Sequence, residues 1–115
     1  MVVGFDGDRT EQWCNWIVRV AGESRPIGAV QATVALDRPG VAVAWEIGVE
    51  WWGHGYASEA AVGLVDLLLA RGIGPVRAFI HPDHAASARV AARAGLSPTN
   101  ERVDGEVVWV SAGRA

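Results

Sequence analysis

Apolar and polar residues alternate through much of the first half of the chain, which is the pattern of β-strands. Residues 13–21 predict a strand with one strongly apolar face. Residues 27–36 predict a second strand. Residues 41–50 are apolar at nearly every position and predict a third strand that is covered on both faces. Because short segments rich in turn residues join these strands, we expect an antiparallel meander.

The spacing of apolar residues becomes helical after residue 56. Apolar side chains then recur at intervals of three and four, which predicts a heavily buried helix that ends at Arg71 and Gly72. Residues 76–81 predict a fourth strand. Because this strand follows a helix, we expect it to pair in parallel with the third strand through a right-handed crossover.

The last third of the chain predicts a helix and a hairpin. A helix is expected over residues 82–95, with Asp83 as its N-cap and Gly95 as its end. Residues 97–111 predict a β-hairpin whose two-residue turn is Asp104-Gly105.

The resulting order, β-β-β-α-β-α-β-β, predicts one α/β domain of the α+β type with a mixed sheet. We expect its core to span residues 13–111, and we interpret residues 1–12 as a loose leader.

Composition narrows the class of protein. Half of the 115 residues are hydrophobic, and the formal net charge of -3 argues against a nucleic-acid-binding protein. Cys14 is the single cysteine, so no internal disulfide can form. No apolar run has the length of a membrane span, and the first residues are polar and acidic rather than a signal peptide. We therefore expect a cytoplasmic protein with no membrane partner.

Gly53 and Gly55 stand directly before the first predicted helix. The first N–H groups of a helix have no intrahelical partner, and glycine lets an anion approach them closely. This arrangement is typical of a phosphate cradle, although two glycines can also serve only a tight turn. A P-loop requires a lysine that is missing here, and a dinucleotide fingerprint requires a third glycine in a parallel unit.

The segment WWGHGYASEA resembles the pyrophosphate loop of the GNAT acetyltransferases, whose motif is Gln/Arg-x-x-Gly-x-Gly/Ala. Trp52, Gly55 and Ala57 fall on the three defined positions. Tryptophan at the first position, together with the residues that follow the loop, is similar to the RimJ/RimL-like branch. The resemblance covers residues 13–111 and implies a GNAT fold and acetyl-coenzyme A as co-substrate.

The resemblance also implies where that cofactor lies. Backbone N–H groups of residues 53–58 would hold its diphosphate, and the third strand would pair with its pantetheine arm. Arg89 or Arg93 could meet its 3'-phosphate, although solvated charges are the plainer interpretation. The implied cofactor-binding residues are Trp45, Glu46, Ile47, Trp52, Gly53, His54, Gly55, Tyr56, Ala57, Ser58, His84 and Ser87.

Ser87 is the candidate partner of the leaving thiolate. It shares one helical face with Val90, Ala91 and Ala94, so its hydroxyl should face the sheet. RimJ/RimL-like proteins resemble this with Asn-x-x-Ser at the helix start, where His84 replaces the asparagine here. Alternatively, the Ser87 hydroxyl only bonds its own helix backbone.

The sequence offers two candidates for the general base, His81 and Glu46. The two strand positions where other GNAT branches carry a base correspond to Val41 and Phe79, and neither can take a proton. His81 lies on the same face as Phe79, and imidazole exchanges protons near neutral pH. Glu46 could order a water, and His81 could equally be an ordinary strand-end residue. His81, Asp83 and His84 are too few for a metal site, so we expect no metal.

Compared with full GNAT domains, the chain is expected to lack the N-terminal strand and helices. The strand over residues 13–21 would then have an unpaired edge beside Trp13, Trp16 and Ile17, which favours a homodimer. The leading hypothesis is an N-acetyltransferase that transfers acetyl directly to a small-molecule or peptide amine. The alternatives are a non-catalytic coenzyme A-binding or dimerisation module and a plain structural domain.

Overall fold

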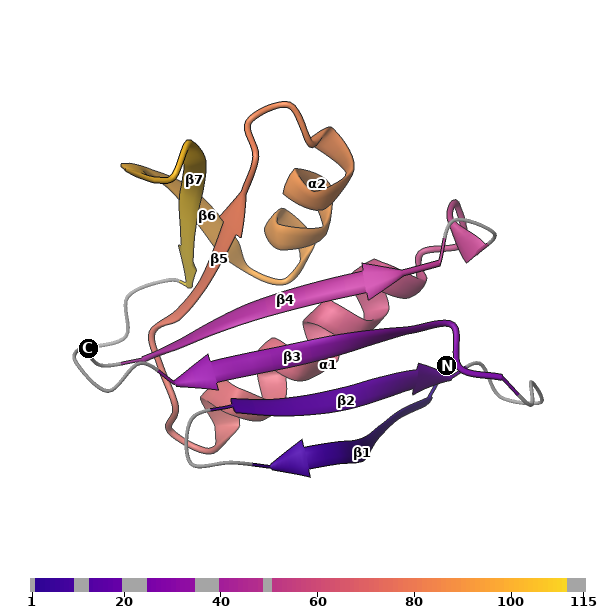
Figure 1. Cartoon of the computed structure of the whole chain (residues 1–115). Helices are drawn as coiled ribbons and strands as arrows, with labels where there is room; N and C mark the ends of the chain where they lie inside the picture. Colours follow the sequence, from indigo (N-terminus) through magenta and orange to yellow (C-terminus); the bar gives the residue numbers. More distant parts are fainter. Residues whose placement is uncertain (1, 10–12, 20–24, 35–39, 49–50, 112–115) are drawn as a thin grey trace.

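The computed structural model describes residues 2–9, 13–19, 25–34, 40–48 and 51–111 (Figure 1). Seven strands form one sheet in the order β1-β2-β3-β4-β5-β7-β6. The elements are β1 (Val2–Arg9), β2 (Trp13–Arg19), β3 (Gly28–Val34), β4 (Val41–Ile47), α1 (Tyr56–Ala70), β5 (Val76–Ile80), α2 (Ala85–Arg93), β6 (Leu96–Val103) and β7 (Glu106–Ser111).

The N-terminal segment departs from the sequence prediction. Val2–Arg9 form β1, which pairs antiparallel with β2, so interpreting residues 1–12 as a loose leader is wrong for the part of it that the structure describes. The alternation in this segment is broken by Gly4 and Gly7, which hides its strand character. Because β1 pairs with β2, the edge of β2 is not open, and that argument for a homodimer does not hold. The side chains of Trp13 and Trp16 lie outside the described residues.

From β2 onward the predicted order is confirmed. β2, β3 and β4 form the antiparallel meander, and β5 pairs in parallel with β4. The helix over 56–70 ends at Arg71 and Gly72 as expected. The hairpin turns at Asp104 and Gly105, which both have positive φ, as a two-residue turn of type I′ requires.

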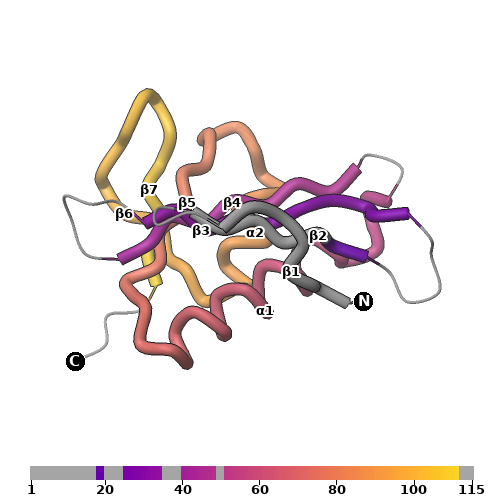
Figure 2. Tube along the Cα trace, turned by 60° about the horizontal axis from the view of Figure 1, so that its bottom comes forward, coloured from indigo at the N-terminus to yellow at the C-terminus, as the bar shows by residue number. Residues whose placement is uncertain are grey.

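Both helices pack on one face of the sheet and build one core. Figure 2 shows α1 below the strands. Alternate residues of β4, including Val41 and Val43, are buried against this side, whereas Ala44 and Glu46 on the other side are exposed. From α1, Ala60, Ala61, Leu64 and Val65 fill the same core. In the described part of the chain no helix covers the opposite face.

The pairing between β4 and β5 is short. It comprises Val41 with Val76 and Ala42 with Arg77, and beyond these residues the two strands diverge (Figure 1). The edge of β4 over residues 43–47 therefore faces a gap rather than a neighbouring strand. This gap positions the candidate site.

Candidate active site

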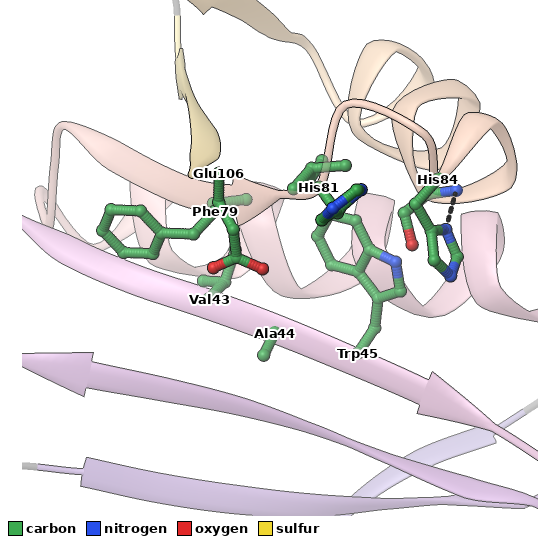
Figure 3. Close-up of a pocket in the computed structure, with 10 residues that line it drawn as sticks. Val43, Ala44, Trp45, Phe79, His81, His84 and Glu106 are labelled. Atoms are coloured by element: carbon green, nitrogen blue, oxygen red, sulfur yellow. Dashed lines mark hydrogen bonds between the residues drawn. The ribbon is translucent and has the colours of Figure 1, made fainter. Parts of the chain in front are cut away.

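A cavity of about 220 Å³ occupies the gap between β4 and β5 (Figure 3). We call it the gap cavity. Its lining residues are Val43, Ala44, Trp45, Ala78, Phe79, Ile80, His81, His84, Ser87 and Glu106. Val43, Ala78 and Ile80 belong to the core on the helix-covered face, whereas Ala44, Phe79 and His81 alternate with them and lie toward the opposite face. The gap cavity is thus lined from both faces of the sheet.

A larger groove of about 840 Å³ adjoins the gap cavity. We call it the long groove. Trp45, His84 and Ser87 line both spaces, so the two are continuous. The long groove follows the end of β4 and reaches the loop before α1 and residues of α2 between Ala85 and Arg93. Of the residues that the resemblance implies for the cofactor, all except His54 line it.

The N-terminus of α1 opens into the long groove. Gly55 is the N-cap, with a φ of 79°, and no side chain caps the helix. The N–H groups of Tyr56, Ala57 and Ser58 have no partner within the helix and carry the positive end of its dipole. Apart from atoms of the adjacent residues, no described atom lies within 4 Å of where a Cβ would stand on Gly53 or Gly55, so the approach to these N–H groups is open.

Hydrogen bonds and ring contacts fix the loop between β4 and α1. The Trp52 indole Nε1 donates to the carbonyl of Ile47 at 2.7 Å, and the N–H of Trp51 donates to the carbonyl of Gly48 at 2.9 Å. His54 does not line the groove; its ring stacks on Tyr56, with the ring centroids 5.3 Å apart. Trp52 and His54 therefore position the loop with their side chains.

His84 and Ser87 meet at the start of α2. The N–H of Ser87 donates to His84 Nδ1 at 3.1 Å, which makes His84 the side-chain cap of α2. The prediction that Asp83 caps this helix is wrong, since the helix begins one residue later than the pattern indicated. Ser87 lines both spaces, and no described residue bonds its hydroxyl, so this group is available to a ligand.

His81 extends from the end of β5 and lines the gap cavity. Its Nδ1 accepts a hydrogen bond from the N–H of Asp83 at 3.1 Å and lies 3.9 Å from the Asp83 carboxylate. In the neutral imidazole the acceptor nitrogen carries no proton, so Nε2 carries it. His81 therefore offers a hydrogen-bond donor through Nε2. Glu46, the other candidate base, lines the long groove but not the gap cavity.

Glu106 is a lining residue that the sequence reasoning missed. It is the first residue of β7, far in sequence from the glycine loop, and it enters the gap cavity only because β7 pairs with β5. The sequence held one signal for Glu106. This residue directly follows the predicted Asp104-Gly105 turn, so it stands at the tip of a hairpin next to the fourth predicted strand.

The charges along the long groove are mixed. Arg89 and Arg93 line it, as do Glu46 and Asp83. Among the described residues, no group of three or more side chains is arranged to hold a metal ion. Neither α1 nor α2 has the length and apolar character of a membrane-spanning helix.

The model of the acetyltransferase (GNAT) domain matches residues 4–97 of the chain. The chain belongs to the GNAT acetyltransferase family. The match begins within β1, so the first strand is part of this GNAT domain and not a leader outside it. No curated protein matches the sequence of this GNAT domain.

Solved structures share the fold. An acetyltransferase from Agrobacterium tumefaciens superposes with a TM-score of 0.76 at 23% identity, over 88% of this chain and 61% of that protein. An aminoglycoside acetyltransferase in complex with coenzyme A and kanamycin superposes with a TM-score of 0.71 at 21% identity, over 87% of this chain and 66% of that protein. A microcin C7 self-immunity acetyltransferase in complex with acetyl-coenzyme A and AMP gives a TM-score of 0.73 at 14% identity, over 88% and 61%. The GNAT domain thus spans somewhat less than two thirds of the length of these proteins.

Proposed function

We propose that this GNAT domain is an acetyl-coenzyme A-dependent N-acetyltransferase that transfers the acetyl group directly to a primary amine. The observation that carries this proposal is the continuity of the long groove with the gap cavity through Trp45, His84 and Ser87. A cofactor in the long groove would present its reactive end at the opening between β4 and β5. An amine could reach the same point from the face of the sheet that no described helix covers.

The residues present fit an anionic cofactor with an amide-containing arm. The uncapped N–H groups at the start of α1 suit a diphosphate, because they combine unpaired donors with the positive end of the helix dipole. The unpaired edge of β4 over residues 45–47 suits pantetheine amides, which can bond it as an added strand would. Arg89 and Arg93 lie in the same groove and suit the 3'-phosphate.

The chemistry needs few protein groups. Acetyl-coenzyme A supplies an activated thioester, and the domain must orient it, accept the amine and serve the departing sulfur. The Ser87 hydroxyl lies where the two spaces meet and would donate to the thiolate. His81 lines the gap cavity, and its Nε2–H would donate a hydrogen bond to the developing oxyanion or to the acceptor.

We also propose that the domain belongs to the RimJ/RimL-like branch. Trp52 at the first position of the loop and Ser87 facing the groove support this placement. His84 departs from the asparagine of that branch but still caps α2. A cytoplasmic location and a homodimer stay predictions.

Two measurements test the function. Calorimetry with coenzyme A should show one binding site per chain. Incubation with acetyl-coenzyme A and a panel of butylamine, spermidine and kanamycin, followed by mass spectrometry, should show an amine that gains one acetyl group. Binding without transfer to any amine would favour the alternative of a non-catalytic coenzyme A-binding module, and absence of binding would contradict both.

A further inference from the structure

Glu106 lines the gap cavity from the hairpin side, opposite the end of β5. In the pairing of β5 with β7, Phe79 lies opposite Val108 and Ile80 opposite Val107. When this register is extended by one residue pair, Glu106 lies opposite His81. Because directly opposite residues share a face of the sheet, Glu106 lies on the same face as His81.

The carboxylate of Glu106 points into the space between β4 and β5 (Figure 3). Glu106 is half-buried, and no hydrogen bond or ion pair joins it to another described residue. Among the described residues that line the gap cavity it is the single carboxylate, and most of its neighbours there are apolar or aromatic. A cation that enters the gap cavity would therefore meet this carboxylate, and the attraction between two charges is stronger at a half-buried position than in open water.

A primary ammonium group fits this end of the gap cavity. It carries the opposite charge to Glu106, and the rings of Phe79 and Trp45 line the same space and can attract a cation through their faces. The apolar walls suit a carbon chain attached to the nitrogen. The long groove, by contrast, does not include Glu106 among its lining residues. The two connected spaces are therefore chemically different at their far ends.

We propose that Glu106 is the catalytic residue that receives the acceptor amine of this domain: its carboxylate binds the ammonium group and takes the proton that the nitrogen must lose before it can attack. This inference rests on the proposed N-acetyltransferase function. It also assigns the substrate class. Glu106 favours amines whose nearby groups are uncharged or cationic. It rejects α-amino acids, because their own carboxylate would lie beside that of Glu106.

The proton balance is complete. The ammonium gives one proton to Glu106, and the free nitrogen lone pair forms the C–N bond to the acetyl carbonyl carbon as the C–S bond breaks. The nitrogen then gives up a second proton, one proton ends on the thiolate sulfur, and Glu106 returns the other to solvent. The products are an N-acetylamine, the free thiol and one released proton.

The other candidate bases are less well placed. The Nδ1 of His81 accepts the N–H of Asp83, so a neutral ring would carry its proton on Nε2 and would have no nitrogen left to accept another. Glu46 does not line the gap cavity. The sequence-based choice of His81 or Glu46 as the base is therefore replaced by Glu106 in this proposal.

The test compares Glu106→Gln with Glu106→Asp and with the control Glu101→Gln. Glu101 lies on β6 of the same hairpin and lines neither space, so its change removes the same charge away from the site. With the fastest amine of the panel, Glu106→Gln should lower kcat/KM at least 100-fold, because a positioned base contributes about that much or more. Glu106→Asp should retain activity within about tenfold, and Glu101→Gln should match the unmodified protein.

Two further readouts separate this role from a structural one. Coenzyme A affinity, measured by calorimetry, should be unchanged in Glu106→Gln, since Glu106 does not line the long groove. The preference for butylamine over norvaline, which is the same chain with an added carboxylate beside the amine, should fall in Glu106→Gln. Retained activity and retained preference in Glu106→Gln would overturn the role of Glu106 and leave the acetyltransferase function intact. An unmodified protein that binds coenzyme A but acetylates no amine would overturn both.

Discussion

The two helices of this domain begin in the same groove, and their N-termini are built in opposite ways. α1 begins at Gly55, which has no side chain to offer, and its first N–H groups are uncapped. α2 begins at His84, whose ring accepts the N–H of Ser87. The N–H groups at the start of α1 stay open to the groove. At the start of α2, one N–H group stabilises the helix and the Ser87 hydroxyl is left open to the groove.

Under the proposed function, the two helix starts would meet different parts of one cofactor. Free backbone donors and a helix dipole suit a phosphate group, which needs several hydrogen bonds and a positive field. A single hydroxyl on a firmly capped helix suits a sulfur atom, which needs one well-placed donor. Changes at the two helix starts should therefore affect different quantities.

The largest effect is expected at the uncapped helix start. Gly55→Ala places a methyl group where the diphosphate must approach, and it should weaken coenzyme A binding about 10- to 100-fold, the loss of roughly one hydrogen bond to a charged group. Calorimetry with coenzyme A measures this change.

Gly72→Ala is the matched control for backbone strain. Gly72 follows the other end of α1, has a φ of 76° against 79° for Gly55, and likewise has no atom within 4 Å of where its Cβ would stand. Both variants should lose similar thermal stability, roughly 1 kcal/mol, but Gly72→Ala should keep its coenzyme A affinity. Equal affinities in the two variants would contradict the role of the Gly55 loop.

The next effect is expected at the hydroxyl of the second helix start. Ser87→Ala should lower kcat roughly tenfold, because it removes one donor to the departing thiolate, and it should leave coenzyme A affinity nearly unchanged. Steady-state kinetics with acetyl-coenzyme A and the fastest amine check this. If kcat stays the same, or if affinity and kcat fall together, Ser87 does not act on the sulfur.

The smallest effect concerns the cap itself. His84→Ala removes the acceptor for the Ser87 N–H and should lower the free energy of unfolding by about 1 kcal/mol. His84→Asn should recover most of this loss, since asparagine is also a good N-cap. Chemical denaturation of the three proteins measures the differences; a His84→Ala variant as stable as the original would show that the cap contributes nothing.

Much of the fold could be predicted from the sequence because the core obeys simple periodicities. The helical spacing around Leu64 and Val65 follows from burial on the helix-covered face. The apolar run of β4 predicted cover on both faces, and this is wrong for the described residues: Ala44 and Glu46 are exposed on the face that no described helix covers. β1 could not be predicted in this way. Its glycines interrupt the alternation, and it is held by pairing with β2, which is a property of two segments and not of one.

The candidate site likewise contains residues that the sequence could indicate and residues that it could not. The groove residues between Trp52 and Ser58, which are all of this segment except His54, belong to one loop and helix start, so a sequence motif could indicate them together. Glu106 is brought to the site by the register of β7 on β5, across more than one intervening element. The cap of α2 was missed for a different reason: an aspartate is the commoner cap, and the histidine next to it also has a suitable acceptor atom.

The tight turn at Asp104 and Gly105 has a consequence for how such a domain could be re-engineered. The turn is two residues long, and the strand after it starts with Glu106, while Thr99 holds the hairpin by donating to the carbonyl of Val108 at 2.7 Å. No residue of this hairpin lines the long groove. If Glu106 receives the acceptor as proposed, exchanging residues 96–111 as one cassette would change acceptor preference and leave the residues that line the long groove as they are.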